Sequence, residues 1–231
     1  MDKNKLEKFQ KTIKISFKNL EILDRVFIHR SFLNENKEKK IESNERLEFL
    51  GDAVLEIIVT KYLYEKYPKE PEGKLTAWRA SLVNGKSLSE SARKINMGEL
   101  LYLSKGEEKT GGRERDLLLA NSFEALIGAI YIEHGMKAVK NFIIDHILIK
   151  LPKIIKEKLY LDPKTHLQEL VQAEIGITPV YKVLKEEGPD HSKNFTLGVF
   201  LNDKMLAVGN GSSKQEAQVK AAQKALENWQ E

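Results

Sequence analysis

Residues 44–55 read NERLEFLGDAVL, and this stretch decides the fold of the first two-thirds of the chain. From Glu45 to Tyr67 apolar side chains recur at the spacing of one helix face, which predicts a long α-helix. Ser43 and Asn44 are candidate N-caps for it, and Pro68 ends the pattern.

Three acidic residues lie along one side of this predicted helix. Glu45, Glu48 and Asp52 stand at positions i, i+3 and i+7. Because a helix turns by about 100° per residue, the three side chains project from nearly one line on its surface. Acidic residues in such a row usually form a solvated face, but the residues between them, Phe49 to Gly51, are apolar or small, which weakens that interpretation.

A second polar pair interrupts the most apolar segment of the chain. The pattern from Asp116 to His134 predicts a helix that is too apolar for the surface and should run through the core. Asn121 and Glu124 stand at i and i+3 on it. A buried carboxylate is costly without a partner, and a divalent cation such as Mg²⁺ prefers oxygen ligands of this kind. The pattern is compatible both with a metal site and with a structural acid cluster.

Turn signals divide the rest of the helical part. Pro71 to Gly73 marks a turn, and residues 75–94 predict one further long amphipathic helix. Residues 104–115 mix three glycines with charges, which predicts a mobile loop. Residues 137–158 continue helical. The basic side chains of the loop could contact phosphates or simply face solvent; they are Lys105, Lys109, Arg113 and Arg115.

The pattern changes near Tyr160, after a lysine-rich stretch with two prolines. A short helix is predicted at 164–175, strands at 179–184, 195–201 and 205–208, and a last helix at 213–229. The predicted fold is therefore multidomain. An all-α domain over residues 1–158 precedes a small α+β domain over 159–231, with the order α-β-β-β-α. Its three strands should form an antiparallel sheet with both helices on one face.

Composition excludes several classes of protein. The chain has 231 residues, 41% of them hydrophobic, and no cysteine, which excludes disulfides, cysteine metal sites and a thiol nucleophile. The absence of a Glu-x-x-His tetrapeptide argues against a di-iron carboxylate bundle. With no apolar run near 18 residues and a lysine-studded N-terminus, we expect no membrane partner and a cytoplasmic location. The net charge of +4 is too mild to prove a nucleic-acid partner.

The motifs resemble those of the ribonuclease III family. Residues 44–55 resemble its most specific motif, and His29-Arg30-Ser31 resembles the segment before it. Residues 71–73 with 79–83, and then residues 123–129, are similar to its later motifs. The C-terminal region resembles a double-stranded-RNA-binding domain at residues 167–170, 188–191 and 209–214. The resemblance spans nearly the whole chain, in the family's domain order.

The resemblance implies a homodimeric, Mg²⁺-dependent endonuclease of double-stranded RNA, in which Mn²⁺ can substitute and no organic cofactor takes part. Each subunit would cut one strand and leave a 5′ phosphate and a short 3′ overhang, in the processing of ribosomal and other precursor RNAs. Carried over residue by residue, the metal ligands are Glu48, Asn121 and Glu124, the catalytic residues are Asp52 and Glu124, and the accessory acids are Glu45 and Glu72. Phe49 is either a core aromatic or, as the resemblance implies, inserts into the partner subunit at the dimer interface.

A-form RNA is recognised through its 2′-hydroxyls and phosphates, because its deep major groove hides the base edges. Three parts of the second domain could do this: its first helix, the loop before its second strand, and the N-terminus of its last helix. The candidate RNA-binding residues are Gln168, Glu169, Gln172, His191, Ser212, Ser213 and Lys214. Each also has a plain interpretation as a surface, turn or capping residue.

Asn121 departs from the family pattern, which usually has Asp at that position. An amide oxygen can ligate Mg²⁺ but brings no negative charge, so metal affinity should fall. Three interpretations remain: a tolerated variant in an active enzyme, which we favour, an engineered substitution that traps substrate, or a protein that binds duplex RNA with weak or no cleavage. The retained acids argue against a decayed site.

Overall fold

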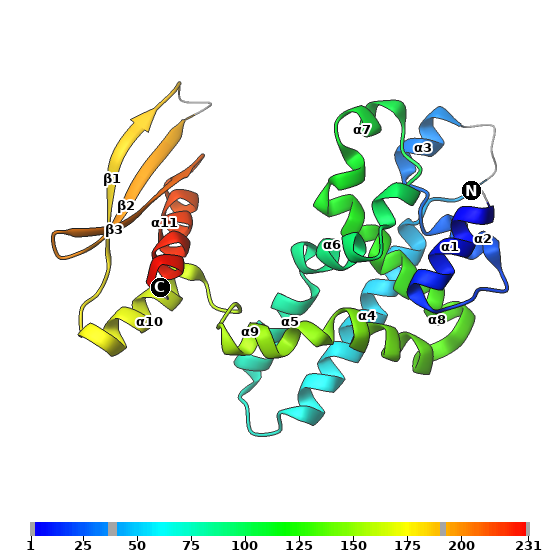
Figure 1. The fold of residues 1–231 in the computed structure, drawn as a ribbon, viewed down its shortest axis with the longest axis horizontal. Coiled ribbons are helices and arrows are strands. Elements are labelled where there is room, and N and C mark those ends of the chain that lie inside the picture. Colours follow the sequence, from blue (N-terminus) through cyan, green and yellow to red (C-terminus); the bar gives the residue numbers. More distant parts are fainter. Residues whose placement is uncertain (1–2, 37–40, 190–192, 230–231) are drawn as a thin grey trace. The chain divides into compact units, whose positions relative to one another are not determined.

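The computed structural model describes residues 3–36, 41–189 and 193–229. The chain divides into two compact units, Met1–Glu157 and Lys158–Glu231. Figure 1 shows the ribbon of both units. Each unit has its own hydrophobic core, and each is described below by itself. Within the described residues, none of the helices is both long and apolar enough to cross a membrane.

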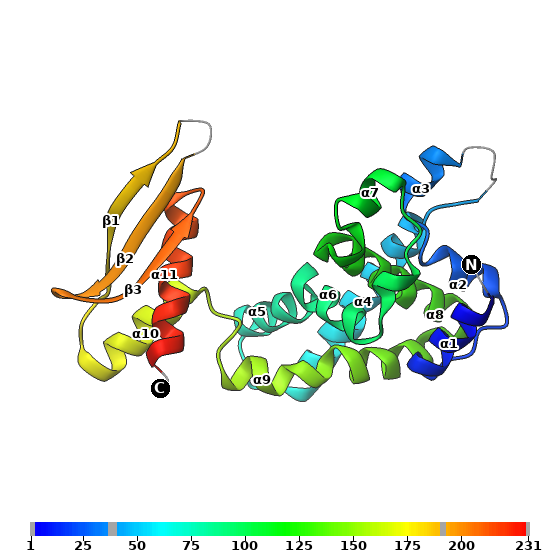
Figure 2. The ribbon, with the colours of Figure 1, turned by 45° about the horizontal axis from the view of Figure 1, so that its top comes forward.

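Unit 1 is entirely helical, and its core forms around α8 (Asp116–His146). The helices that precede α8 are α1 (Lys3–Ile13), α2 (Leu20–Arg25), α3 (Arg30–Glu35), α4 (Glu45–Lys66), α5 (Glu72–Val83), α6 (Gly85–Lys94), η1 (Met97–Leu100), α7 (Lys105–Lys109) and η2 (Gly112–Glu114). After α8 come η3 (Leu148–Lys150) and α9 (Leu151–Lys156). The most extensive helix–helix contact joins α4 and α8, whose ribbons cross in both views (Figure 1, Figure 2).

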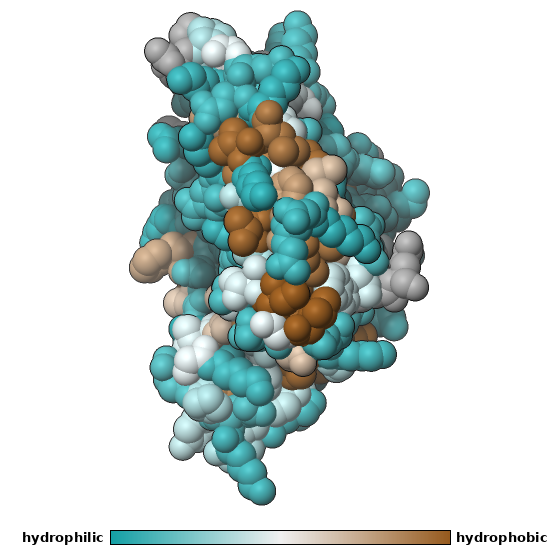
Figure 3. All heavy atoms as spheres, turned by 90° about the vertical axis from the view of Figure 1, so that its left-hand side faces the viewer, coloured by the Kyte–Doolittle hydropathy of each residue, from teal (hydrophilic) through white to brown (hydrophobic). Residues whose placement is uncertain are grey.

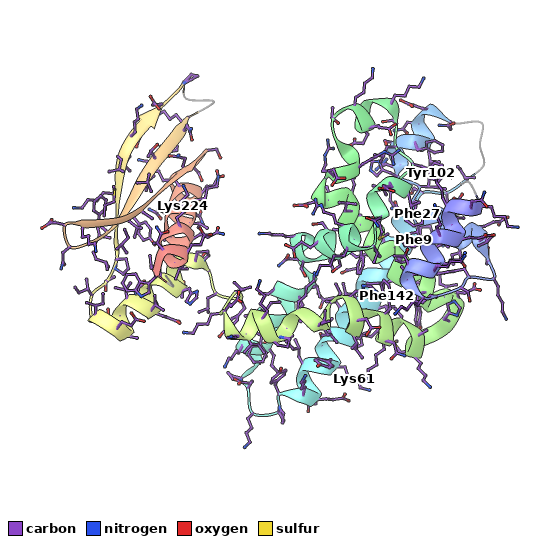
Figure 4. The ribbon with its side chains drawn as sticks, viewed as in Figure 1. Phe9, Phe27, Lys61, Tyr102, Phe142 and Lys224 are labelled. Atoms are coloured by element: carbon purple, nitrogen blue, oxygen red, sulfur yellow. The ribbon has the colours of Figure 1, made fainter. Side chains whose placement is uncertain are left out.

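Aromatic side chains fill the core between the N-terminal helices and α8. Phe9 and Phe27 point toward each other in Figure 4, with ring centroids 5.1 Å apart in an edge-on arrangement. Phe142 packs at 5.5 Å from Phe123 on the same helix, α8. Fourteen residues of α8 are buried, so the prediction of a helix running through the core is confirmed.

The prediction of one long helix over residues 75–94 is wrong. Two helices, α5 and α6, meet at Asn84, whose backbone is extended (φ −69°, ψ 158°). The Asn84 side chain accepts a hydrogen bond from the Ser87 amide (2.9 Å) and so caps α6. Asparagine is among the best N-cap residues because its side-chain oxygen replaces a missing backbone acceptor. The stabilisation from this cap favours two helices over the one continuous helix that the amphipathic pattern predicts.

The predicted loop at 104–115 is also more regular than expected, because it contains the short helices α7 and η2. Its two arginines hold the segment together. Arg113 pairs with Glu108 (2.7 Å) and donates to the carbonyls of Gly98 and Leu101, each at 3.0 Å. Arg115 pairs with Glu107. Both arginines therefore bond to the chain itself, although Arg115, like Lys105 and Lys109, is exposed.

Unit 2 has the predicted order of helix, three antiparallel strands and helix. Its elements are α10 (Pro163–Ile175), β1 (Val180–Glu187), β2 (Asn194–Leu201), β3 (Lys204–Gly211) and α11 (Lys214–Trp229). The sheet has the order β1-β2-β3, and Val199 faces Tyr181 on one side and Ala207 on the other. Both helices lie on one face of the sheet (Figure 2).

The two faces of this sheet differ. On the covered face, α11 packs directly on β3, because a Cβ added at Gly209 would lie 2.2 Å from the Ala217 carbonyl oxygen. On the open face, apolar side chains gather in a patch (Figure 3). Its most exposed members include Val180, Leu184 and Met205, each about half exposed.

Candidate functional site

Two glycines let the backbones of α4 and α8 touch. A Cβ added at Gly51 would lie 1.7 Å from the carbonyl oxygen of Glu124, and one added at Gly128 would lie 2.3 Å from that of Leu47. Real Cβ atoms do not approach a backbone oxygen this closely, so no larger residue fits without moving the helices. The two helices therefore cross next to their acidic residues. On α4, Gly51 lies between Glu48 and Asp52, and on α8, Gly128 lies one turn after Glu124.

This crossing brings four of the predicted site residues together. Glu48 and Asp52 come from α4, and Asn121 and Glu124 come from α8. The Asn121 amide donates a hydrogen bond to the Glu48 carboxylate. Asp52 and Glu48 both act electrostatically on Glu124. Side-chain oxygens separated by some 70 residues of sequence thus share one small region.

The electrostatics of this group show an excess of negative charge. Burial raises the pKa of Glu124 to about 7, and the charges of Asp52 and Glu48 act in the same direction. Burial also raises the pKa of Glu48, as do the charges of Glu45 and Asp52, whereas the hydrogen bond from Asn121 lowers it. Within the described residues, no Lys or Arg forms an ion pair with Glu48, Asp52 or Glu124.

The donor set fits a divalent cation that prefers oxygen. Three carboxylates and one amide oxygen offer hard ligands in a partly buried place, and their mutual repulsion would be relieved by a positive ion. Among the described residues, however, no group of three Asp, Glu or His side chains stands close enough to hold a metal ion without other ligands. An open arrangement of this kind suits Mg²⁺, which keeps several waters and takes further oxygens from substrate phosphates.

Of the two predicted accessory acids, Glu45 lies at the edge of this group, where its charge acts on Glu48, and Glu72 lies outside it. Glu45 is exposed, accepts a hydrogen bond from Ser43 Oγ (3.0 Å) and faces Arg30 at 3.4 Å. Glu72 is in the first turn of α5 and accepts from Thr76 Oγ1 (2.9 Å). Glu72 also lines a cavity of about 640 Å³ between the C-terminal half of α4 and α5. One chain by itself does not bring Glu72 to the other acids.

Phe49 is not a core aromatic, because 81% of its surface is exposed. It begins a stripe of exposed apolar side chains on α4 that continues through Ala53 and Ile57 to Tyr64. Ile57 is 56% and Tyr64 73% exposed. We call these four residues the α4 stripe. Exposed Lys61 lies between Ile57 and Tyr64, but a row of large exposed apolar side chains of this kind still indicates an interaction site on a protein surface.

In unit 2, the predicted residues of α10 are exposed. Gln168 and Gln172 lie one turn apart, and Gln172 accepts a hydrogen bond from Thr178 Oγ1 at 3.3 Å. Glu169 lies 4.0 Å from Lys158. His191, the candidate of the loop, lies outside the described residues.

The N-terminus of α11 is already occupied by groups of the chain itself. Ser213 Oγ accepts from the Glu216 amide (3.1 Å), so Ser213 caps the helix. Ser212 donates to Glu216 through its amide (2.8 Å) and its hydroxyl (2.7 Å). Lys214 pairs with Glu186 at 2.7 Å. Hydrogen bonds from Lys220 and Ser212 hold the pKa of Glu216 down to about 2.

Asn44 lies beside the site and has a role that the sequence did not reveal. It is the N-cap residue of α4, as predicted, but its side chain makes no cap hydrogen bond. Its Nδ2 instead donates to the Val26 carbonyl oxygen (3.2 Å) and to Ser122 Oγ (3.3 Å). A signal was present in the sequence, because Ser122 is a polar residue next to Asn121 in a segment expected to be buried.

Comparisons with known proteins show the family of each unit. Residues 19–151 match the model of the Ribonuclease-III-like family, and residues 163–228 match the double-stranded RNA binding motif. The chain is 48% identical over 227 residues to Ribonuclease 3 of Carboxydothermus hydrogenoformans, covering 98% of this chain and 97% of that protein. It is 45% identical to Ribonuclease 3 of Bacillus licheniformis, over 97% of this chain and 90% of the relative.

Among solved structures, the nuclease domain of ribonuclease III from Campylobacter jejuni superposes with a TM-score of 0.58 at 39% identity. The match covers 64% of this chain and 99% of that domain. In that Campylobacter domain, a region involved in dimer formation is structurally flexible. The family match, the relatives and the two units lead to one conclusion: this chain belongs to the ribonuclease III family of endoribonucleases, with a double-stranded RNA binding motif after the nuclease domain.

Proposed function

We propose that this chain hydrolyses phosphodiester bonds within double-stranded RNA, depends on Mg²⁺, which Mn²⁺ can replace, and leaves 5′ phosphates and short 3′ overhangs. The observation that carries the proposal is the convergence of Glu48, Asp52 and Glu124 where α4 and α8 cross. The adjoining double-stranded RNA binding motif supports a duplex as the substrate. The natural targets would be ribosomal and other precursor RNAs in the cytoplasm.

Each side chain of the group has a separate task in this proposal. Glu48, Asn121 and Glu124 would hold the cation. When bound, the ion supplies Lewis acidity toward the scissile phosphate and lowers the pKa of a bound water. Asp52 is exposed beside Glu124, where its carboxylate can orient the attacking water and accept a proton from it.

Asn121 is consistent with an active enzyme. Its amide already donates a hydrogen bond to Glu48, and it adds no fourth negative charge to a group that repels itself. Its carbonyl oxygen remains a possible ligand. No observation of the structure favours a protein that binds duplex RNA without cutting it, and the three carboxylates of the group are retained.

A symmetric dimer through the α4 stripe would complete the site. Phe49 and Tyr64 lie at nearly equal distances along the helix from Ile57, so two antiparallel α4 helices paired about Ile57 would place Phe49 against the partner's Tyr64. Tyr64 lines the 640 Å³ cavity, which could receive the partner's Phe49. Glu72 lines the same cavity and would then lie near the partner's acidic group, as an accessory acid beside the scissile phosphate. Glu45 would be the accessory acid of the chain's own site.

In unit 2, Gln168, Glu169 and Gln172 would meet 2′-hydroxyls, and His191 would act from the loop. Phosphates would be contacted by Ser212, Ser213 and Lys214. This contact requires that the ion pair between Lys214 and Glu186 and the hydrogen bond from the Ser212 amide to Glu216 first break. From residue 161 onward the chain has 8 Lys and 10 acidic residues. Binding by one such unit should therefore be weak, and two units in a dimer would strengthen it by avidity.

The test compares the wild type with Asn121→Asp and Glu124→Gln on long duplex RNA in Mg²⁺. We expect the wild type to cut and Glu124→Gln to bind the duplex without cutting it. If the wild type leaves duplex RNA intact while Asn121→Asp cuts it, the chain is a binding protein with an impaired site. Single-stranded RNA of the same sequence is the control for duplex specificity.

A further inference from the structure

Asn44 is a buried polar residue that ties three segments together at the edge of the acidic group. Only 2% of its surface is exposed. Its backbone amide donates to the Ile28 carbonyl (2.9 Å), and its own carbonyl accepts from the Glu48 amide (2.9 Å). Its side chain reaches Val26 and Ser122. It thus links the segment before α3, the first turn of α4 and the second turn of α8.

The bond to Ser122 joins the two helices that carry the acids. Ser122 is 1% exposed and lies between Asn121 and Glu124 in the sequence of α8. Asn44 lies directly before Glu45 and is one helical turn from Glu48. The Asn44–Ser122 hydrogen bond is therefore a direct polar tie between the first turn of α4 and the α8 turn that supplies Asn121 and Glu124.

We propose that Asn44 is a positioning residue for the metal site: its amide, through Ser122, fixes the first turn of α4 against α8 so that Glu48 converges with Asn121 and Glu124. The glycine crossing sets how closely the helices approach, but close contact alone leaves α4 free to slide or rotate. A directional hydrogen bond removes that freedom. This inference rests on the proposed function, because it requires a cation to be held between the two helices.

A purely structural role is the competing interpretation, since any buried hydrogen bond stabilises a fold. The two interpretations differ in what Ser122→Ala changes. That variant keeps the Asn44–Val26 bond and removes only the acceptor on α8. Ser91→Ala is the matched control, because Ser91, on α6, is also 1% exposed and donates from Oγ to the His146 carbonyl (2.9 Å).

The experiment measures Mn²⁺ binding to the RNA-free full chain by electron paramagnetic resonance, with thermal unfolding of each variant alongside. A hydrogen bond contributes about 1 kcal/mol, which corresponds to roughly fivefold in a binding constant. We expect Ser122→Ala to weaken Mn²⁺ binding about fivefold, and Ser91→Ala to lower the melting temperature with unchanged Mn²⁺ affinity. Asn44→Ala should weaken binding at least as much, and the double variant Asn44→Ala with Ser122→Ala no more than Asn44→Ala alone.

The positioning role is overturned if Ser122→Ala is destabilised like Ser91→Ala but binds Mn²⁺ within twofold of the wild type. Should Asn44→Ala fail to fold, Ser122→Ala still decides the question. A wild type that binds Mn²⁺ but does not cut duplex RNA contradicts the proposed function and leaves the positioning role standing. A wild type that binds no Mn²⁺ overturns both.

Discussion

Gly51→Ala tests whether the backbone contact between α4 and α8 sets the geometry of the site. The added methyl carbon would lie 1.7 Å from the Glu124 carbonyl oxygen and 2.6 Å from its carbonyl carbon. Relief of this overlap to an ordinary contact requires the helices to separate by about 1.5 Å. Because both obstructing atoms belong to the backbone, no side-chain rotation can absorb the change.

Two effects of this substitution oppose each other. Overpacking of a tight core costs about 1–3 kcal/mol or more, whereas replacement of glycine by alanine within a helix gains about 1 kcal/mol. We expect a net loss near 2 kcal/mol, or about 4–8 °C in melting temperature for a chain of this size. A displacement of about 1 Å at the reacting groups reduces the rate by about 100-fold, so cleavage should fall far more than stability.

The assays are thermal unfolding followed by circular dichroism and initial rates of duplex RNA cleavage in saturating Mg²⁺. Gly106→Ala in α7 is the control, since its added Cβ would come no closer than 4.0 Å to Ser104 Oγ. It should cleave as the wild type does and unfold at the wild-type temperature or slightly above it, because alanine favours the helix and its methyl group meets no obstruction. If Gly51→Ala retains the wild-type melting temperature and rate, the two helices do not touch as described and the reasoning is refuted.

Three other substitutions, apart from their controls, test the charge of Glu124, the charge at position 121 and the dimer interface at Phe49. The folded-state pKa of Glu124, about 7, lies above its ordinary value of 4.5, so the free energy of unfolding without metal should fall as pH rises between these values. With a chelator present and near pH 8, the free energy of unfolding of Glu124→Gln should therefore exceed that of the wild type by on the order of 2 kcal/mol, measured by urea denaturation. Equal stability of the two proteins would argue against burial of the Glu124 carboxylate. Asn121→Asp adds a charge beside the cation, so half-maximal cleavage should need roughly tenfold less Mg²⁺. Phe49→Asp should weaken dimerisation by about 30-fold or more, measured by analytical ultracentrifugation. Leu117→Asp is the control, because Leu117 is 63% exposed but lies outside the α4 stripe, and this variant should dimerise as the wild type does.

The sequence predicted the features that depend on local periodicity. The long α4 helix, the buried α8 helix and the position of the β2 strand all follow from side-chain spacing. The break in α8 at Gly135 (φ 72°) was not predicted, and burial along β2 does not alternate strictly. Placement of the acids on α4 and α8 followed from the same spacing. Their convergence needed the family resemblance, because periodicity does not say which helices cross.

Other features could not be predicted, because they depend on competition between local and distant partners. Asn84 and Asn44 have the same side chain, yet one caps a helix and the other spans to Ser122. Arg113 could have faced a phosphate or the chain's own carbonyls, and it binds the carbonyls. Phe49 belongs to an apolar motif and yet is exposed, because the face of α4 that it occupies has no neighbour within the monomer.

The occupied N-terminus of α11 has a consequence for turnover. Glu216 and Glu186 hold Ser212 and Lys214 as a phosphate would. If a duplex binds at this N-terminus, as we propose, it must displace acids that are covalently tethered beside it. Such tethered competitors would discourage polyanions that offer only one or two phosphates, and they would re-form their own bonds when a cut duplex loosens, which would favour rapid release of product.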